Sequence, residues 1–222
     1  MFPLRAIPAL GCAIALAACG AVPERSSQSQ APVSAPRPVA STPDAQMCLA
    51  GLGQTGSRFS PLPDRYYGGG CSAVNAVQLS AVQGDRAHFG VSNIGPVTCP
   101  TAQTFAAWAR FGVDRAARQI LGSPVERIET MGSYACRNVA GTNRRSAHSQ
   151  AAAIDVSAFV LADGRRISVL NDWSQGSAAE QEFLRVVHKS ACKRFGTVLG
   201  PAYNAAHRDH FHLEQGDGRF CR

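Results

Sequence analysis

The sequence predicts an α+β domain with a largely antiparallel sheet and flanking helices. Two stretches carry apolar residues at helical spacing, and several short apolar runs are separated by Gly, Pro and Asp-Gly turns, as expected of strands and hairpins. This mixture differs from the regular strand–helix alternation of a doubly wound fold. Neither G-x-G-x-x-G after a strand nor G-x-x-x-x-G-K-[ST] occurs, so nucleotide binding has no support.

Two helices are expected. The first runs from Pro100 to Leu121, because Pro suits a first helical turn and apolar residues recur at helical spacing until Gly122-Ser123-Pro124 ends the pattern. The second begins after Ser177, which has the form of a capping box with Glu180, and ends near Lys193. Each helix should bury one face against the sheet.

The expected strands are short and mostly joined by turns. Asp163-Gly164 offers a hairpin turn between two of them, and Gly200-Pro201 breaks another. The strands are expected at residues 125–134, 152–160, 166–170, 196–199 and 210–214.

The N-terminal part differs in composition from the rest. Residues 1–18 have the charged start and apolar middle of a secretory signal, and Leu16-Ala17-Ala18-Cys19 resembles a bacterial lipobox. This resemblance implies lipidation of Cys19, and Gly20 after it favours the periplasmic face of the outer membrane; the alternative is an ordinary signal peptide. Residues 19–46 are rich in Ser, Pro, Ala and Gln, which predicts a flexible tether. The folded domain is expected over residues 47–222.

Six cysteines fall in the expected domain. An even number in an exported chain indicates disulfides, and the absence of a C-x-x-C pair argues against a thiolate zinc site. Their spacing does not select a pairing, and buried free thiols are the alternative. The cysteines are Cys48, Cys71, Cys99, Cys136, Cys192 and Cys221.

The chain is basic, with a formal net charge of +7. A basic exported protein can be attracted to nucleic acid, anionic lipid or the carboxylates of the cell wall. No nucleic-acid motif is present, so no nucleic-acid partner is expected.

His148 and Asp155 stand in a run of small residues, and a second polar cluster, residues 207–212, lies near the C-terminus. Zinc accepts neutral imidazole and carboxylate, and a catalytic site uses three protein ligands with one open position. On an extended last strand His210 and His212 would share a face, because side chains alternate with period two. One of them can then bind metal while the other faces substrate.

The pattern Ser146-x-His148-x-x-Ala151-x-Ala153-x-Asp155 followed by H-x-H resembles the zinc peptidases of the D-alanyl-D-alanine carboxypeptidase, lysostaphin and Hedgehog group. A narrower resemblance, over about residues 47–222, is to the extensin-like C-terminal domain family of bacterial proteins. Six segments in order carry it: Ser133-Tyr-Ala-Cys136-Arg137, Ala153-Ile-Asp155-Val, Asp163-Gly164, Asp172-Trp173, Cys192-x-x-Phe195-Gly-Thr-Val-Leu-Gly200-Pro201 and His207-x-Asp209-His210-Phe211-His212.

The resemblance implies a Hedgehog- or peptidase-like fold and a Zn²⁺ cofactor held by His148, Asp155 and His212. Where the wider group has Gly, this chain has Ala151, which would strain the loop if that position needs a positive φ.

The resemblance also implies roles next to the metal. His210 would stabilise the developing oxyanion, and Asp209, three residues before the last ligand, would be the general base. His207 is a second candidate for proton transfer. Arg137 could pair with a peptide carboxylate in bidentate fashion. The base position holds Asp and not the longer Glu, so its reach to the reacting water is an open question.

The resulting expectation is a lipid-anchored zinc metallopeptidase of the cell envelope that hydrolyses peptidoglycan stem peptides, as a carboxypeptidase or endopeptidase. Zinc would lower the pKa of bound water to about 7 and polarise the scissile carbonyl. The alternative is a non-catalytic, zinc-stabilised module that binds the cell wall or a partner protein.

Overall fold

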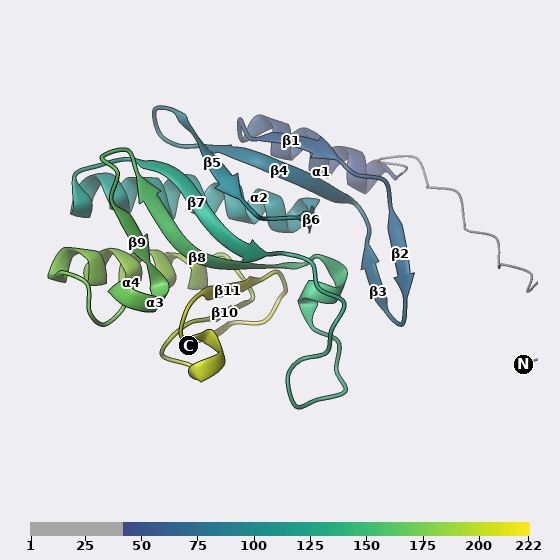
Figure 1. Cartoon of the computed structure of the whole chain (residues 1–222). Coiled ribbons are helices and arrows are strands. Elements are labelled where there is room, and N and C mark those ends of the chain that lie inside the picture. The colour runs from purple at the N-terminus through teal and green to yellow at the C-terminus, as the bar shows by residue number, and fades with distance from the viewer. Residues whose placement is uncertain (1–41) are drawn as a thin grey trace, which may run out of the picture. The chain divides into compact units, whose positions relative to one another are not determined.

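The computed structural model describes residues 42–222, and the statements below refer to this part of the chain (Figure 1). The expected signal peptide, Cys19 and most of the expected tether lie outside the described residues. Helix α1, Pro43–Gln54, spans the expected boundary at residue 46, so its first turn occupies the end of the segment assigned to the tether. Within residues 42–222 no helix combines the length and apolar character needed to cross a membrane.

The strands form one large, mostly antiparallel sheet and a separate hairpin, which confirms the α+β class. The order in the large sheet is β1-β4-β5-β7-β8-β11-β10-β12, with β6 paired to β4 and β9 to β8. Only the β5–β7 and β10–β12 pairs are parallel among the described strands. The strands of this sheet are β1 Arg58–Pro61, β4 Ala76–Gln83, β5 His88–Ser92, β6 Pro96–Thr98, β7 Val125–Gly132, β8 Ala153–Leu161, β9 Arg166–Ser168, β10 Thr197–Leu199, β11 Phe211–Glu214 and β12 Phe220–Cys221. The hairpin is formed by β2 Arg65–Gly68 and β3 Cys71–Ala73.

Both predicted helices are present. The first starts as α2, Cys99–Trp108, but continues through the π-helical turns η1, Ala109–Asp114, and η2, Ala117–Leu121, before Gly122 ends it with φ 72°. The second is α4, Ala178–Cys192, and the Ser177 capping box forms as expected. The strand expected at 166–170 ends at Ser168, because a short helix, α3, Val169–Asp172, begins there. Two short 3₁₀ turns are η3, Ala147–Gln150, and η4, Ala205–His207.

The main core lies between the sheet and the layer formed by α2, η1, η2 and α4 (Figure 1). Trp108 is completely buried there, and its indole N–H donates to the Val187 carbonyl at 2.9 Å. On β11, Phe211 and Leu213 belong to this core, and the Phe211 ring lies 5.1 Å from the His188 ring of α4. Because side chains alternate along a strand, the intervening His212 points away from the helices.

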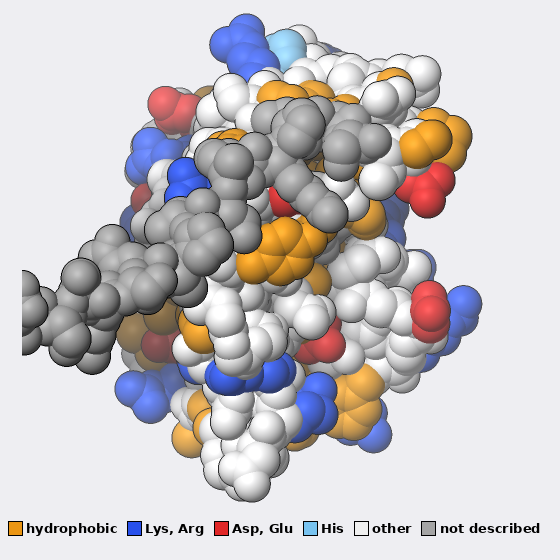
Figure 2. All heavy atoms as spheres, turned by 90° about the vertical axis from the view of Figure 1, so that its right-hand side faces the viewer, with side chains coloured by type: hydrophobic (Ala, Val, Ile, Leu, Met, Phe, Trp, Pro, Cys, Tyr) orange, Lys and Arg blue, Asp and Glu red, His pale blue; other side chains and the backbone are white. Residues whose placement is uncertain are grey.

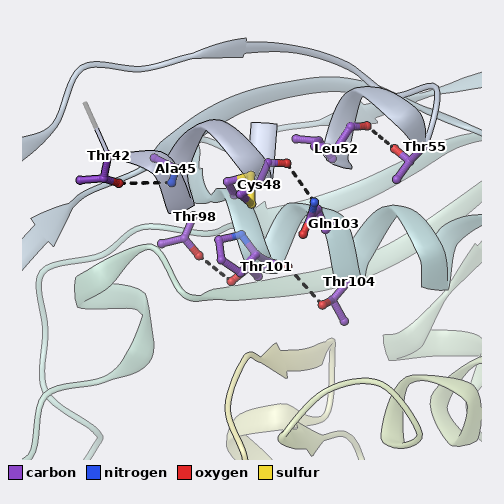
Figure 3. The surroundings of a disulfide bond; sticks show 11 residues. Thr42, Ala45, Cys48, Leu52, Thr55, Thr98, Thr101, Gln103 and Thr104 are labelled. Carbon is purple, nitrogen blue, oxygen red and sulfur yellow. Dashed lines mark hydrogen bonds between the residues drawn. A yellow bond between two sulfur atoms is a disulfide. The ribbon is translucent and has the colours of Figure 1, made fainter. Parts of the chain in front are cut away.

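All six cysteines of the domain are paired, so the expected disulfides are confirmed and the free-thiol alternative is wrong. Cys48–Cys99 joins α1 to α2, where the Gln103 side chain also donates to the Cys48 carbonyl at 2.9 Å (Figure 3). The other two disulfides are Cys71–Cys136, which ties the β2–β3 hairpin to the segment after β7, and Cys192–Cys221, which ties α4 to β12. Residues 42–222 thus contain two hydrophobic core clusters and three disulfides.

Candidate metal centre

A short 3₁₀ turn positions His148 next to the start of β8. The Ser146 side chain caps this turn by accepting from the His148 backbone N–H at 3.4 Å. The turn ends at Ala151, which is buried and has φ 55°, so the position that the wider zinc-peptidase pattern fills with Gly does lie in the left-handed region. Alanine is strained there by about 1 kcal/mol. The chain nevertheless makes the turn and enters β8 two residues later.

Strand pairing brings the other two predicted ligands together. Asp155 of β8 and His212 of β11 are direct partners in the antiparallel β8–β11 ladder. Directly opposed side chains in such a pair lie on the same face of the sheet. This is the face away from the helical layer, and His148 reaches it from η3.

The donor atoms of His148, Asp155 and His212 converge. His148 Nε2 lies 3.1 Å from His212 Nδ1 and 3.2 Å from Asp155 Oδ2, and His212 Nδ1 lies 2.9 Å from Asp155 Oδ1. Ligands about 2.0–2.1 Å from a tetrahedral zinc ion are roughly 3.3 Å apart, so the three distances are close to those of a zinc site. The structure thus brings all three predicted ligands into one group that could hold a metal ion.

The outer nitrogens of both rings are already occupied by acceptors. His148 Nδ1–H donates to the Ser133 carbonyl at 3.1 Å, and His212 Nε2–H donates to the Glu214 carboxylate at 3.2 Å. These bonds fix the tautomers so that the two inner nitrogens face each other as lone pairs beside a carboxylate, which requires a cation between them. Such second hydrogen bonds are usual for metal-ligating histidines.

The pKa values of His212 and Asp155 also indicate that the group needs a cation. Burial alone would lower the pKa of His212, but hydrogen bonds with Asp155 and Glu214 raise it to about 9. Burial disfavours the Asp155 carboxylate, yet hydrogen bonds with His148 and His212 hold its pKa well below the usual range. Without a metal His212 is therefore protonated at neutral pH, and its charge balances that of the Asp155 carboxylate.

His210 lies at the edge of this group. As expected from the alternation, it shares the face of His212; its Nε2 is 3.6 Å from Asp155 Oδ1 and its Nδ1 is 2.8 Å from Asp209 Oδ1. Asp209 therefore contacts His210, and the imidazole lies between the two carboxylates.

His207 completes this side of the site. Its ring centroid lies 5.1 Å from that of His210 and 5.9 Å from that of His212, and its Nδ1–H donates to Asn204 Oδ1 at 2.7 Å. Burial, followed by the nearby histidines, lowers the pKa of His207 to about 4. The ring is therefore neutral at physiological pH, and its Nε2 is a free acceptor.

Arg137 is exposed on the segment after β7. Its charge contributes to the low pKa of His207, which places it on the same side of the molecule as the metal group. Glu214 was missed by the sequence analysis, although the spacing His210-x-His212-x-Glu214 on one strand places all three side chains on one face.

A second group of potential ligands, His188, Cys192 and Cys221, lies on the helical side of the sheet. Its two cysteines are joined in a disulfide, so no thiolates are present to bind a metal. Burial lowers the pKa of His188, whose Nε2 is buried without a hydrogen-bond partner. Its ring packs against Trp173 and Phe211, with centroids 5.8 and 5.1 Å away, which fits a structural role.

Fold and site together define a disulfide-stabilised α+β domain. Its candidate metal centre consists of two histidines and one aspartate on the face of the sheet that points away from the helical layer. The family model described as the extensin-like protein C-terminus matches residues 46–222. The chain therefore belongs to this family. Comparison with curated proteins and with solved structures gave no significant match.

Proposed function

We propose that the domain is a zinc-dependent peptidase that hydrolyses amide bonds in peptidoglycan stem peptides. The observation that carries this proposal is the convergence of one carboxylate and two imidazole lone pairs, with the unliganded His210 next to them. A purely structural metal site needs no such proton carrier at its edge. The resemblance to zinc peptidases and the expected envelope location support the choice of substrate.

The donor set fits zinc, with His148, Asp155 and His212 as the residues that would hold it. When bound, zinc supplies a Lewis acid for the amide carbonyl and makes a coordinated water more acidic. Both imidazoles are already oriented by Ser133 and Glu214, so little reorganisation is required for binding.

His210 is the residue best placed to carry the proton. Asp209 accepts from its Nδ1–H, which leaves Nε2 as the basic nitrogen on the side of Asp155. In hydrolysis the water oxygen bonds to the carbonyl carbon, the C–N bond breaks, and the proton lost by water passes through His210 to the leaving amine. In this proposal Asp209, expected from the sequence to be the base, orients His210.

Two further residues would position the substrate. The neutral His207 presents an acceptor that can bind a peptide N–H, and Arg137 presents a guanidinium that can bind a peptide carboxylate. We further propose lipidation at Cys19 and attachment to the periplasmic face of the outer membrane. Mass spectrometry of the mature N-terminus, compared with a Cys19→Ser variant, tests the anchor.

The alternative is a non-catalytic, zinc-stabilised module that binds the cell wall or a protein. The near-complete burial of the three ligand side chains favours it, because a buried metal contributes mainly to stability.

Two variants separate the proposals. His212→Ala should lose zinc, whereas His210→Ala should keep it. The measurement is zinc content together with muropeptide release from isolated peptidoglycan. The peptidase proposal expects cleavage by the wild type and loss of cleavage in both variants. Stoichiometric zinc without cleavage by the wild type would refute the peptidase and support the binding module.

A further inference from the structure

The sequence contains only two lysines, Lys189 and Lys193, and every other basic residue is an arginine. Lys189 lies in the last turn of α4 and Lys193 is the C-cap residue that follows it, four residues further on, so the two side chains project from the same side of the helix end. Within residues 42–222 neither forms an ion pair. Two uncompensated charges are thus concentrated at one place.

The lysines border two adjoining hollows on the outer side of the helical layer. The first, of about 540 Å³, is lined by α4 alone, from Ala178 to Lys189. The second, of about 420 Å³, lies between α4 and the π-helical turn η1. Val186 and Lys189 line both hollows, so the two adjoin and form one shallow, open surface.

The linings are strongly cationic. Glu182 is the one carboxylate among the residues that line these hollows. Arg115 is paired with Asp85 at 2.8 Å, and Arg194 donates to the Ser190 carbonyl at 2.9 Å. The lining cations are Arg115, Arg185, Lys189, Lys193 and Arg194.

Large apolar side chains are exposed among these charges. Phe111 is 44% exposed and Val186 is 39% exposed. The guanidinium groups of Arg110 and Arg115, which both pair with Asp85, lie 5.1 and 4.7 Å from the Phe111 ring centroid. Gly112 forms the floor, because a Cβ there would lie 2.3 Å from Ser190 Oγ. We call this surface the α4 basic face; it comprises the five lining cations with Phe111 and Val186.

The α4 basic face and the metal group lie on opposite sides of the sheet. His188 and Phe211 pack together between α4 and β11, whereas His212 points from β11 to the other side. Anything bound to the α4 basic face would leave the metal group uncovered.

We propose that the α4 basic face docks on the surface of an anionic phospholipid membrane. The exposed Phe111 and Val186, on one surface with the unpaired Lys189 and Lys193, fit a headgroup boundary, where lysines contact phosphates and apolar side chains enter the interface. A soluble polyanion offers nothing to Phe111 and Val186, which is why the lipid surface is favoured. Docking in this orientation would point the metal group away from the membrane. The inference does not depend on peptidase activity.

The test uses residues 42–222, which hold the described core clusters and their three disulfides and lack Cys19, the expected lipidation site. Sedimentation is measured with phosphatidylcholine vesicles and with vesicles that also contain phosphatidylglycerol. We expect binding to the anionic vesicles alone, weakening as salt is raised. Lys189→Gln with Lys193→Gln should reduce partitioning roughly 30-fold, because each cation near an anionic surface contributes about 1 kcal/mol.

The matched control is Arg58→Gln with Arg65→Gln, which removes the same charge from exposed positions on β1 and β2; β2 lies on the side of the molecule that Figure 2 shows. This variant should bind as the wild type does. Equal loss in the control would show that net charge alone attracts the protein, and no binding to anionic vesicles would also overturn the proposal. Phe111→Ser separates the two kinds of partner. Unchanged vesicle binding by this variant would indicate a site for a soluble polyanion and refute membrane docking.

Discussion

Removal of the metal should make the stability of residues 42–222 depend on pH where His212 titrates. Without a metal, the proton on His212 holds the ligand group together, and its pKa is raised from 6.5 to about 9. A raised folded-state pKa stabilises the fold below pH 6.5, and that stabilisation is lost as pH rises to about 9. The free energy of unfolding should fall by roughly 3 kcal/mol over this range.

The zinc-loaded protein should not show this loss, because a ligating imidazole nitrogen carries no proton to release. Guanidinium unfolding gives the free energy of unfolding of the metal-free and the zinc-loaded protein at pH 6.5 and at pH 9. Subtracting the pH-dependent change of the zinc-loaded protein from that of the metal-free protein removes the contribution of all other groups. Asp155→Asn is the control, since without this carboxylate only Glu214 still raises the pKa of His212, and the metal-free protein should lose less stability. Parallel pH dependence of the metal-free and zinc-loaded proteins would refute the assignment of His212 as a ligand.

Three further variants test the surroundings of the group. Glu214→Gln weakens the acceptor for the His212 Nε2–H and should lower zinc affinity by about 10–100-fold. Unchanged affinity in a chelator competition would contradict a role of Glu214 in orienting His212. Ala151→Gly relieves the left-handed strain while losing a buried methyl, so its free energy of unfolding should stay within about 1 kcal/mol of the wild type. By contrast, Ala158→Gly, buried on β8 and without such strain, should cost about 1.5 kcal/mol, and equal losses would show that Ala151 is unstrained. Replacing both Cys71 and Cys136 with serine should lower the free energy of unfolding by about 4 kcal/mol, because this disulfide closes the longest loop of the three that the structure describes. A loss no greater than that for serine at both Cys192 and Cys221 would contradict the dependence on loop length.

The two helices of the layer that covers the sheet, and the C-terminal strands, could be predicted because their signals are local, whereas α1 and α3 were missed. A capping box marks the start of α4, and the alternation around Phe211 identifies one strand with two functional histidines. The ligand set was implied by the resemblance to the zinc-peptidase pattern, because alternation along the strand places His210 and His212 on one face and does not choose between them.

The first two strands were missed for a physical reason. Strands β1 and β2 are short and largely exposed, with Tyr66 65% exposed, so no buried alternation marks them. The π-helical turns were also missed, because the apolar spacing of Pro100–Leu121 hardly differs between α and π geometry. Glu214 becomes significant only once the strand pairing is known, and the disulfide pairing depends on contacts across the whole domain.

The direct pairing of Asp155 with His212 makes metal binding a check on strand register. If β11 slipped by one residue against β8, Phe211 or Leu213 would replace His212 on the face that carries the metal group, and the donor set would lose one imidazole. A bound ion would therefore stabilise one alignment of these two strands selectively over its neighbours. The metal ion would thus stabilise the native register of the β8–β11 pairing, which joins two segments that are far apart in the sequence.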